Sequence, residues 1–170
     1  MIIKNNEEAI RLNCTDVLPE EVGTLIETLE NELKVSSLMG NHGIGLAAPQ
    51  LGIAKKAAIV RIDNIKINLI NCSIEKYYDP FIFRNEGCLS FPGRIENTNR
   101  FQEIVIVDNL IYPNKFTVTG LVAVCCQHEI EHFNNKLFFE NKIIEKAKYQ
   151  RPNDKCNCNS GLKYKKCCGK

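Results

Sequence analysis

Two histidines four residues apart, with a glutamate after the first, are the clearest chemical feature of the sequence; they lie in the stretch Gln127–His132. On a helix, residues four apart lie on the same face, so His128 and His132 can direct both imidazoles toward one metal ion. Glu129 lies beside that face, where a carboxylate can take a proton from a water on the metal without binding the metal itself. The spacing therefore indicates a hydrolytic metal centre.

The same helical face continues upstream of the histidines. Leu121, Val124 and Cys125 precede His128 by seven, four and three residues, and the face extends on to His132. Apolar residues and metal ligands therefore share one stripe, which predicts a metal against an apolar wall. Two alternatives stay open. The histidines could lie on a solvated amphipathic helix, and the three apolar residues could be ordinary core.

A cysteine in the segment Glu86–Arg94 could supply a third ligand. Cys88 follows Gly87 and precedes the pair Pro92–Gly93, so we expect it on a bent, exposed segment rather than inside a strand. One cysteine and two histidines leave the fourth position of a tetrahedral site open for water, as a catalytic site requires.

The run Gly43–Gln50 consists mostly of small residues and ends in an amide. Small side chains allow a ligand or another backbone to approach closely, and the side-chain NH2 of Gln50 can donate to a developing oxyanion. A tight loop with a solvated Gln50 is the alternative.

Other patterns predict the elements that position these groups. Pro19 begins a predicted helix that ends at about Gly40, with an apolar stripe from Val22 to Leu33. Short runs rich in Val, Ile and Phe predict strands over residues 57–63, 65–74, 103–110 and 116–119.

Length and composition are typical of an ordinary globular protein. The chain has 170 residues, of which 44% are hydrophobic and 25% charged, which suits one compact domain with a short appendage. No apolar run approaches the ~20 residues that span a bilayer, and the first residues show no signal-peptide pattern. We therefore expect a cytoplasmic protein with no membrane partner.

The nine cysteines argue against a secreted disulfide framework, because their number is odd and four fall within the last fifteen residues. We expect reduced thiols, some of them metal ligands. Cys14, Cys72 and Cys126 are interpreted as small buried apolar residues.

Three of these motifs together resemble the peptide deformylase family, which carries a Gly-x-Gly-Leu-Ala-Ala-x-Gln loop, a Glu-Gly-Cys-Leu-Ser segment and a His-Glu-x-x-His helix. Here they follow the family's order at residues 43–50, 86–90 and 127–132. The resemblance implies a catalytic domain over residues 1–148. It also implies an α+β fold in which mixed and antiparallel strands surround the central metal-binding helix.

For the reaction, the resemblance implies a metal-dependent hydrolase that removes the N-formyl group from the N-terminal methionine of newly made polypeptides and releases formate. The divalent ion would be Fe²⁺, with Ni²⁺, Co²⁺ or Zn²⁺ able to substitute. Its ligands would be Cys88, His128 and His132. Glu129 would transfer the proton, and the Gln50 side chain and the Leu89 backbone N–H would donate to the oxyanion.

The resemblance also extends to the substrate pocket and its support. Six residues match positions that line the pocket for the first side chain: Gly43, Ile44, Gly45, Leu121, Val124 and Cys125. Glu86 and Arg100 match a pair that braces the cysteine segment. The chain departs from the family at Glu131, Phe133 and Asn135, where Asp, Leu and Gly are usual. Because no ligand, base or oxyanion donor is altered, we expect activity to survive.

The end of the chain is a second, basic unit over residues 149–170. From Lys142 onward, nine Lys or Arg residues accompany only two acidic residues. A linker leads to two cysteine pairs that resemble the SEC-C motif, a short zinc-binding tail: Cys156 and Cys158, Cys167 and Cys168. Four thiolates can hold one structural Zn²⁺, so we expect a small zinc knuckle that folds only with its ion. A cysteine-rich end without an ion is the alternative.

Positive charge on this tail suggests a partner. A cationic zinc knuckle beside a deformylase predicts a tether to the ribosome, through rRNA phosphates or a ribosomal protein. The alternative is a solvated basic end that aids solubility and binds no partner.

Two other functions stay open. A catalytically quiet deformylase-like module, tethered through its zinc tail, would keep the fold without the chemistry, although the intact Glu129 and Gln50 argue against it. A zinc endopeptidase shares the His-Glu-x-x-His pattern but would take its third ligand from a residue other than Cys88.

Overall fold

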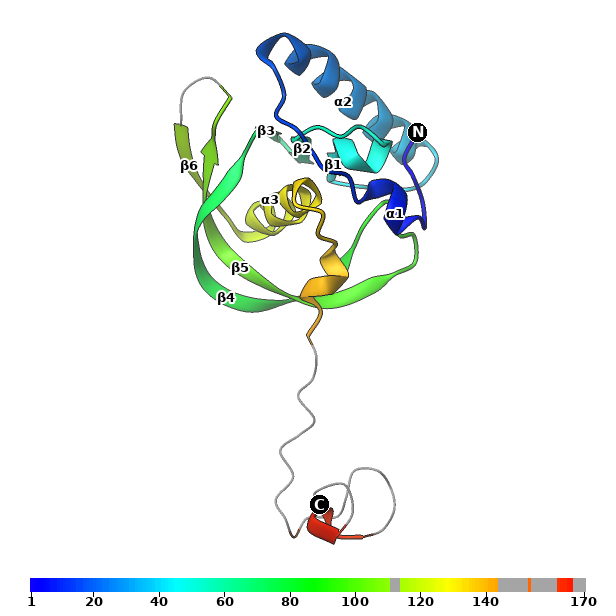
Figure 1. Cartoon of the computed structure of the whole chain (residues 1–170), viewed down its shortest axis with the longest axis vertical. Helices are drawn as coiled ribbons and strands as arrows, with labels where there is room; N and C mark the ends of the chain where they lie inside the picture. The colour runs from blue at the N-terminus through cyan, green and yellow to red at the C-terminus, as the bar shows by residue number, and fades with distance from the viewer. Residues whose placement is uncertain (111–113, 144–152, 154–161, 167–170) are drawn as a thin grey trace.

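The computed structural model describes residues 1–110, 114–143, 153 and 162–166. These residues form two three-stranded sheets, a long helix packed against the first sheet, and a second helix between the two sheets (Figure 1). The α+β fold class predicted from the sequence is confirmed. The zinc knuckle lies outside the described residues, because its four cysteines fall in 154–161 and 167–170.

The helix predicted from Pro19 is confirmed. It begins with one 3-10 turn, η1 (Pro19–Glu21), and continues as α2 (Val22–Leu38). Proline suits the first turn, because the N–H that it lacks would have no helical partner there. Leu29 and Leu33 are buried on the face that packs against the first sheet. The remaining short helices are α1 (Glu7–Ile10), η2 (Ala48–Leu51), η3 (Phe138–Asn141) and η4 (Tyr164–Lys166).

The first sheet is antiparallel with the order β1-β2-β3. Its strands are β1 (Gly45–Ala47), β2 (Ala57–Ile62) and β3 (Ile65–Ile70). All residues from Ala57 to Val60 are fully buried, because α2 and the central helix contact β2. Burial of β2 on both faces explains why its apolar residues form a continuous run. The pairing of Gly45 with Val60 holds the Gly43–Gln50 loop against this rigid strand.

The second sheet is antiparallel with the order β4-β5-β6. Its strands are β4 (Ser73–Gly87), β5 (Ile95–Asp108) and β6 (Asn114–Thr119). Most of β4 and the first half of β5 carry no sequence pattern that predicts a strand. In the described sheet β4 is an edge strand with most of its residues exposed, so it lacks the apolar alternation that reveals a strand.

The predicted strand over residues 65–74 is wrong in one respect: it is two strands. Asn71 adopts a φ of 51°, in the left-handed region, and separates β3 from β4. Its side chain exchanges two hydrogen bonds with the backbone of Val17, at 2.7 and 2.9 Å. Asparagine tolerates this conformation better than other non-glycine residues, so it lets the chain pass from one sheet to the other.

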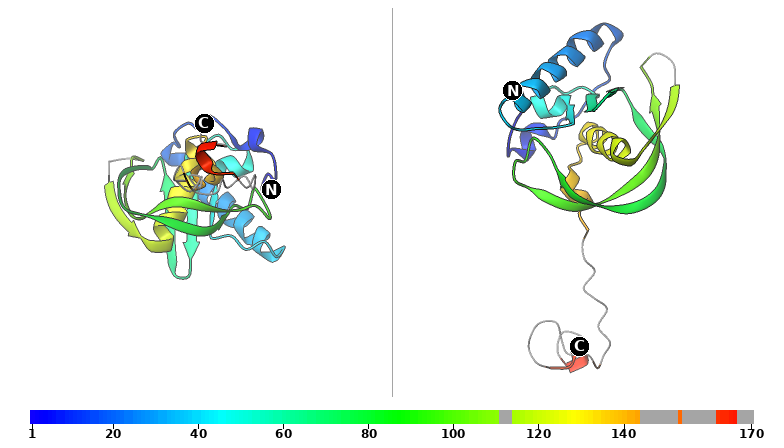
Figure 2. Two further views of the ribbon diagram at one scale, coloured as in Figure 1. Left: turned by 90° about the horizontal axis from the view of Figure 1, so that it is seen from below. Right: turned by 180° about the vertical axis from the view of Figure 1, so that it is seen from behind.

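The central helix is α3 (Gly120–Phe133), which carries both histidines. The curved second sheet encloses one side of α3, and the first sheet and α2 lie on the other (Figures 1 and 2). Every residue from Ala123 to Ile130 is buried, so the solvated amphipathic helix considered above is excluded. Both sheets are antiparallel, and the one parallel pairing among the described residues is an isolated bridge between Thr15 and Lys55.

The predicted burial holds for two of the three cysteines interpreted as core residues. Cys72 and Cys126 are buried as predicted, but the prediction for Cys14 is wrong. Cys14 is partly exposed. In its segment the buried residues are Ile10 and Val17, on either side of it, and Thr15 pairs with Lys55 in an isolated bridge. In the part of the chain that the structure describes, no helix combines the length and apolar character needed to cross a membrane.

Candidate metal centre

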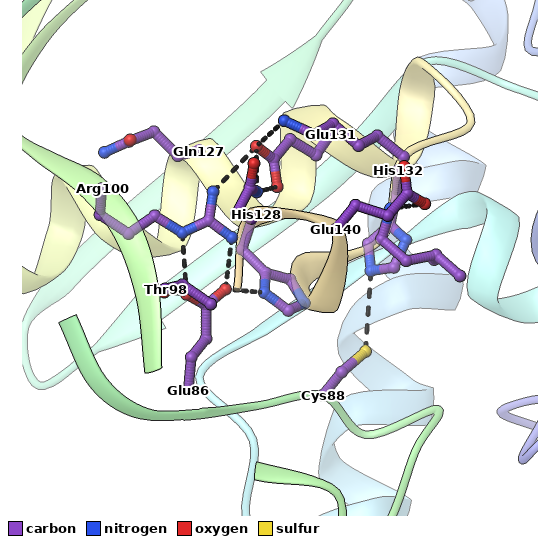
Figure 3. Close-up of polar contacts among 12 residues, drawn as sticks. Glu86, Cys88, Thr98, Arg100, Gln127, His128, Glu131, His132 and Glu140 are labelled. Carbon is purple, nitrogen blue, oxygen red and sulfur yellow. Dashed lines mark hydrogen bonds and ion pairs between the residues drawn. The ribbon is translucent and has the colours of Figure 1, made fainter. Parts of the chain in front are cut away.

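Cys88, His128 and His132 converge at one place, although they come from two segments forty residues apart in the sequence. Their ligand atoms lie within 4.8 Å of one another, and Cys88 Sγ is 3.7 Å from His132 Nε2 (Figure 3). In a tetrahedral site with bonds of about 2.3 Å to sulfur and about 2.1 Å to nitrogen, these two atoms would be about 3.6 Å apart. Cys88 and His132 therefore have the spacing of two ligands of one ion, and His128 belongs to the same group of potential ligands.

Local structure explains how Cys88 reaches the histidines. Strand β4 ends at Gly87, and the chain turns back through a hydrogen bond from the Phe91 N–H to the Cys88 carbonyl, at 2.9 Å. Asn5 donates its N–H to the carbonyl of Ser90 at 2.8 Å, which anchors this turn to the N-terminal segment. Cys88 is thus held on a bent, partly exposed segment, as the sequence predicted.

His128 is oriented by Glu86. The Glu86 carboxylate lies 2.6 Å from His128 Nδ1, which leaves Nε2 of the same ring to face the centre. Arg100 and Thr98 also donate to this carboxylate (Figure 3). Burial alone would raise the pKa of Glu86, but the hydrogen bonds from His128 and Arg100 outweigh it and hold the pKa at about 2. Glu86 is therefore an anion at neutral pH and fixes the tautomer of the imidazole.

Buried polar atoms in the centre lack partners within the described residues. His132 Nδ1 and Glu129 Oε2 are both buried without a hydrogen bond there. Burial lowers the pKa of His132 well below its usual value, so this ring is neutral, which is the form that binds metal. Burial also lowers the pKa of His128, but hydrogen bonds with Cys88 and Glu86 outweigh it and raise the pKa well above normal. A cation can replace the proton held there, so the donor set fits a metal ion.

Glu129 borders the three candidate ligands without belonging to them. Its side chain is 5% exposed, and burial raises the pKa of the carboxyl to about 7. Gly45 makes room for it, because a Cβ at that position would overlap Glu129 Oε1. The small-residue loop therefore has a specific purpose: it allows a carboxylate to lie against the backbone of β1.

Gln50 has one possible orientation in its hydrogen-bond network. Its Oε1 accepts the Ala47 N–H at 2.8 Å, so its Nε2 must be the atom that donates to Cys88 Sγ at 3.3 Å and to Ser90 Oγ at 3.1 Å. The side chain is 1% exposed. The solvated loop glutamine considered above is therefore excluded, and the amide N–H group lies beside the candidate ligand.

The six predicted pocket residues line one cavity of about 520 Å³ together with Gln50, Cys88, Leu89, His128 and Glu129. Val124 and Cys125 are buried in its wall, whereas Ile44 and Leu121 are 40% and 46% exposed at its rim. A Cβ on Gly43 would overlap the Leu89 side chain, so this glycine allows the loop and the cysteine segment to meet.

Several residues that support the centre could not be predicted from the sequence. Phe138 stacks on the His128 ring, with the centroids 5.6 Å apart and the planes at 28°. Ser90 and Thr98 are fully buried partners of Gln50 and Glu86. Gln127 joins α3 to β5 by bonding both backbone groups of Phe101, at 2.8 and 3.1 Å. The sequence carries no periodic signal for these residues, because each acts through a contact distant along the chain.

The three departures from the family pattern are all accommodated. Asn135 has a φ of 63°, where glycine is favoured and asparagine is tolerated. Phe133 is 5% exposed in the core beside α3. Glu131 lies 2.9 Å from Arg100 Nη1, so the longer side chain still reaches the guanidinium.

Arg100 is expected to be essential for stability. The side chain is 1% exposed, and replacing it by Met would remove one of the two cationic partners of the buried Glu86 carboxylate and would leave Glu131 without its guanidinium. Breaking a buried pair in this way typically costs about 3–5 kcal/mol. Urea unfolding would measure the loss. Lys115→Met is the matched control, because Lys115 is 56% exposed in its 2.6 Å pair with Glu75 and exposed pairs contribute about 1 kcal/mol or less. Equal losses in the two variants would contradict the prediction.

Comparisons with known proteins agree with this geometry. Residues 1–148 match the polypeptide deformylase family, and residues 153–170 match the SEC-C motif. Peptide deformylase 1 of Pseudomonas syringae pv. tomato is 38% identical over 103 residues, which cover 58% of this chain and 61% of the relative. A peptide deformylase of Endomicrobium trichonymphae is 33% identical over 144 residues, which cover 82% of this chain and 83% of the relative.

Solved structures show the same fold. A peptide deformylase from Legionella pneumophila matches with a TM-score of 0.72 and 30% identity, covering 85% of this chain and 86% of that one. A peptide deformylase from Synechococcus elongatus, in complex with actinonin, matches with a TM-score of 0.73 and 28% identity, covering 85% and 79% of the two chains. The family match over most of the chain, together with these relatives, shows that the chain belongs to the polypeptide deformylase family.

Proposed function

We propose that Cys88, His128 and His132 form the catalytic metal site at which this deformylase removes the formyl group from the N-terminal methionine of newly made polypeptides. One observation carries the proposal. Ligand atoms from two separate motifs lie within 4.8 Å of one another, and Gln50, from the third motif, donates to the cysteine among them. Water is consumed, the bond between the formyl carbon and the nitrogen breaks, and the products are formate and a free N-terminal amine.

The family is metal-dependent, and we propose Fe²⁺ as the ion in the cell, with Ni²⁺, Co²⁺ or Zn²⁺ able to substitute. A thiolate and two imidazoles suit first-row divalent ions of this kind. When bound, the ion would supply Lewis acidity, which polarises a carbonyl and makes water a stronger nucleophile near neutral pH.

Glu129 is the proposed proton carrier. Its Oε2 is buried and has no hydrogen-bond partner among the described residues, so it is free to accept a proton from the attacking water. Burial raises the pKa of the carboxyl to about 7, which allows it to release the proton again near neutral pH. The proton would pass to the departing nitrogen, because a neutral amine is a better leaving group than the corresponding amide anion.

Gln50 and the Leu89 backbone N–H are the proposed donors to the oxyanion. Two acceptors, Ser90 Oγ and Cys88 Sγ, keep the Gln50 amide in place before the substrate binds. The amide has two N–H groups, so donation to the oxyanion would replace one of these two bonds, and the fixed position of the side chain keeps the reorganisation small.

Replacing Gln50 by Ala is expected to lower kcat by about 100- to 1000-fold, because one preorganised oxyanion donor is lost. Steady-state kinetics on a formyl-Met peptide would measure this loss. Ser90→Ala is the informative control: it removes one acceptor that holds the amide and should cost much less than the amide itself. A kcat unchanged in the Gln50 variant would contradict this role.

Gly43, Ile44, Gly45, Leu121, Val124 and Cys125 are the proposed contacts for the methionine side chain. All six line the cavity beside the candidate ligands, and their apolar or small side chains suit an unbranched thioether.

We propose a division into a catalytic domain over residues 1–148 and a basic zinc-binding tail over 149–170. Cys156, Cys158, Cys167 and Cys168 would hold one structural Zn²⁺, and the match of residues 153–170 to the SEC-C motif supports this. The positive charge of the tail supports a tether to the ribosome in the cytoplasm, where formylated chains emerge.

Truncation after residue 148 is expected to remove one of two bound ions and to leave deformylation of a short peptide unchanged. Metal analysis of anaerobically purified protein would count the ions, and co-sedimentation at low salt would test the tether. If the truncated chain sediments with ribosomes as the full chain does, the tether is wrong. If it keeps both ions, the tail site is wrong.

Formate release from a formyl-Met peptide by the Fe²⁺- or Ni²⁺-loaded chain tests the proposed activity. A quiet binding module would release none, and an endopeptidase would cleave internal peptide bonds instead. Mass spectrometry of the products separates the three outcomes.

A further inference from the structure

Asn141 makes an unusual contact at the end of η3. Its Nδ2 lies 2.8 Å from both carboxylate oxygens of Glu131, a residue of α3. The Glu131 side chain is 18% exposed, so solvent can reach this carboxylate from one side. The Asn141 amide therefore holds a partly accessible carboxylate in one orientation.

The oriented carboxylate faces the guanidinium of Arg100. Glu131 Oε1 lies 2.9 Å from Arg100 Nη1, and Arg100 Nε donates to Glu86 Oε2 at 2.8 Å (Figure 3). Arg100 is 1% exposed, so no water can replace a lost partner without a rearrangement. Each of its two carboxylate partners therefore limits where the guanidinium can lie.

The chain of contacts ends at a candidate metal ligand. Glu86 is 4% exposed, and its Oε1 lies 2.6 Å from His128 Nδ1. A partner on the second imidazole nitrogen fixes both the tautomer and the plane of a ligand ring. A shift of Arg100 would shift the Glu86 carboxylate and with it the ring of His128.

We propose that Asn141 is a positioning residue for the metal centre: through Glu131, Arg100 and Glu86 it sets the orientation of His128. The inference rests on the proposed role of His128 as a ligand. Without the Asn141 amide, the Glu131 carboxylate turns toward solvent and toward Lys136, whose Nζ lies 3.3 Å from Oε1. The ion pair between Glu131 and Arg100 then weakens. Asn141 does not line the substrate cavity. A second route to the centre runs through its own helix η3, where Phe138 stacks on the His128 ring, and the double variant below separates the two routes.

Asn141→Ala and Lys136→Ala in the full-length protein form a matched pair, because both residues contact the same carboxylate. Lys136 is 41% exposed, and its Nζ lies 3.3 Å from Glu131 Oε1, so its pair with Glu131 is the weaker, solvent-exposed one. Co²⁺ is the probe, with its absorption spectrum and its affinity measured in competition with a chelator. The spectrum of a Cys88→Ser variant supplies the contribution of other Co²⁺ sites, the tail included.

Loss of the Asn141 amide is expected to weaken Co²⁺ binding at the Cys88 centre by about 10-fold, the lower end of what partners of metal ligands contribute. The Co²⁺ bands should shift, and kcat should fall by a similar factor with KM unchanged. Lys136→Ala should change none of these. If Asn141 had only a structural role, its loss would lower the melting temperature of the metal-free chain. The Co²⁺ affinity, the spectrum and kcat would stay as in the unmodified protein. That result would overturn the inference.

A double variant tests the route. Glu131→Ala removes the carboxylate through which Asn141 would act. It should weaken Co²⁺ binding at least as much as Asn141→Ala, and the combination should be no worse than Glu131→Ala alone. Additive effects would show that Asn141 acts on its own and would overturn the inference. If Cys88→Ser leaves Co²⁺ binding unchanged, the proposed metal site itself is wrong, and the inference fails with it.

Discussion

Replacing Glu129 by Gln is expected to lower kcat by about 100- to 10,000-fold, the range that a positioned general base typically contributes. The amide has nearly the shape of the carboxyl and still fits against Gly45, where there is no room for a Cβ. It cannot accept a proton, however, so the water is no longer activated. Metal content and the unfolding midpoint should stay close to those of the unmodified chain.

The unchanged metal content separates this role from that of a ligand. Glu129 lies outside the group of three side chains whose ligand atoms lie within 4.8 Å of one another. If the Gln variant lost its ion, Glu129 would be a ligand rather than a base. Retention of full activity would exclude it from the chemistry altogether.

Cys88→Ser is expected to abolish deformylation. Residues that only hydrogen-bond to a metal ligand contribute about 10- to 100-fold in affinity or activity. Loss of a ligand itself should therefore lower activity by more than about 100-fold. A serine hydroxyl is a poor substitute for a thiolate at a first-row ion. Metal analysis should show one ion fewer than in the unmodified chain, and the ion that remains should belong to the tail.

Cys14→Ser serves as the matched control for this experiment. Cys14 is a partly exposed free cysteine outside the group of candidate ligands and outside the residues that line the cavity. Its substitution should leave metal content and kcat/KM unchanged. Hydrolysis that survived in Cys88→Ser but not in His132→Ala would point to a third ligand elsewhere and would revive the endopeptidase alternative.

The chemistry of the centre could be predicted from the sequence because its strongest constraint is local. Helix geometry places residues four apart on one face, so His128 and His132 share a face wherever the helix lies. Gly45 and Gln50 could be predicted from residue type, because a run of small residues that ends in an amide indicates close approach of a ligand even when the fold is unknown. The structure adds the reason for Gly45, which is the close approach of Glu129.

The second sheet shows where sequence patterns fail. Most residues of β4 are exposed, and Asp79 and Pro80 stand in the middle of the strand. Neither residue favours a strand. Instead, pairing with β5 holds β4 in place. The register of this pairing depends on the whole sheet and not on any short stretch of sequence.

The sequence by itself determined which groups carry out the chemistry, because residue type and helical spacing are properties of the chain. Only the tertiary structure decided what holds them. Phe138 on the His128 ring, Ser90 beside Gln50, and the contacts from Asn141 to Glu86 all join residues that no short repeat relates. These contacts form where separate elements meet, and their strength comes from burial, which exists only once the chain has folded.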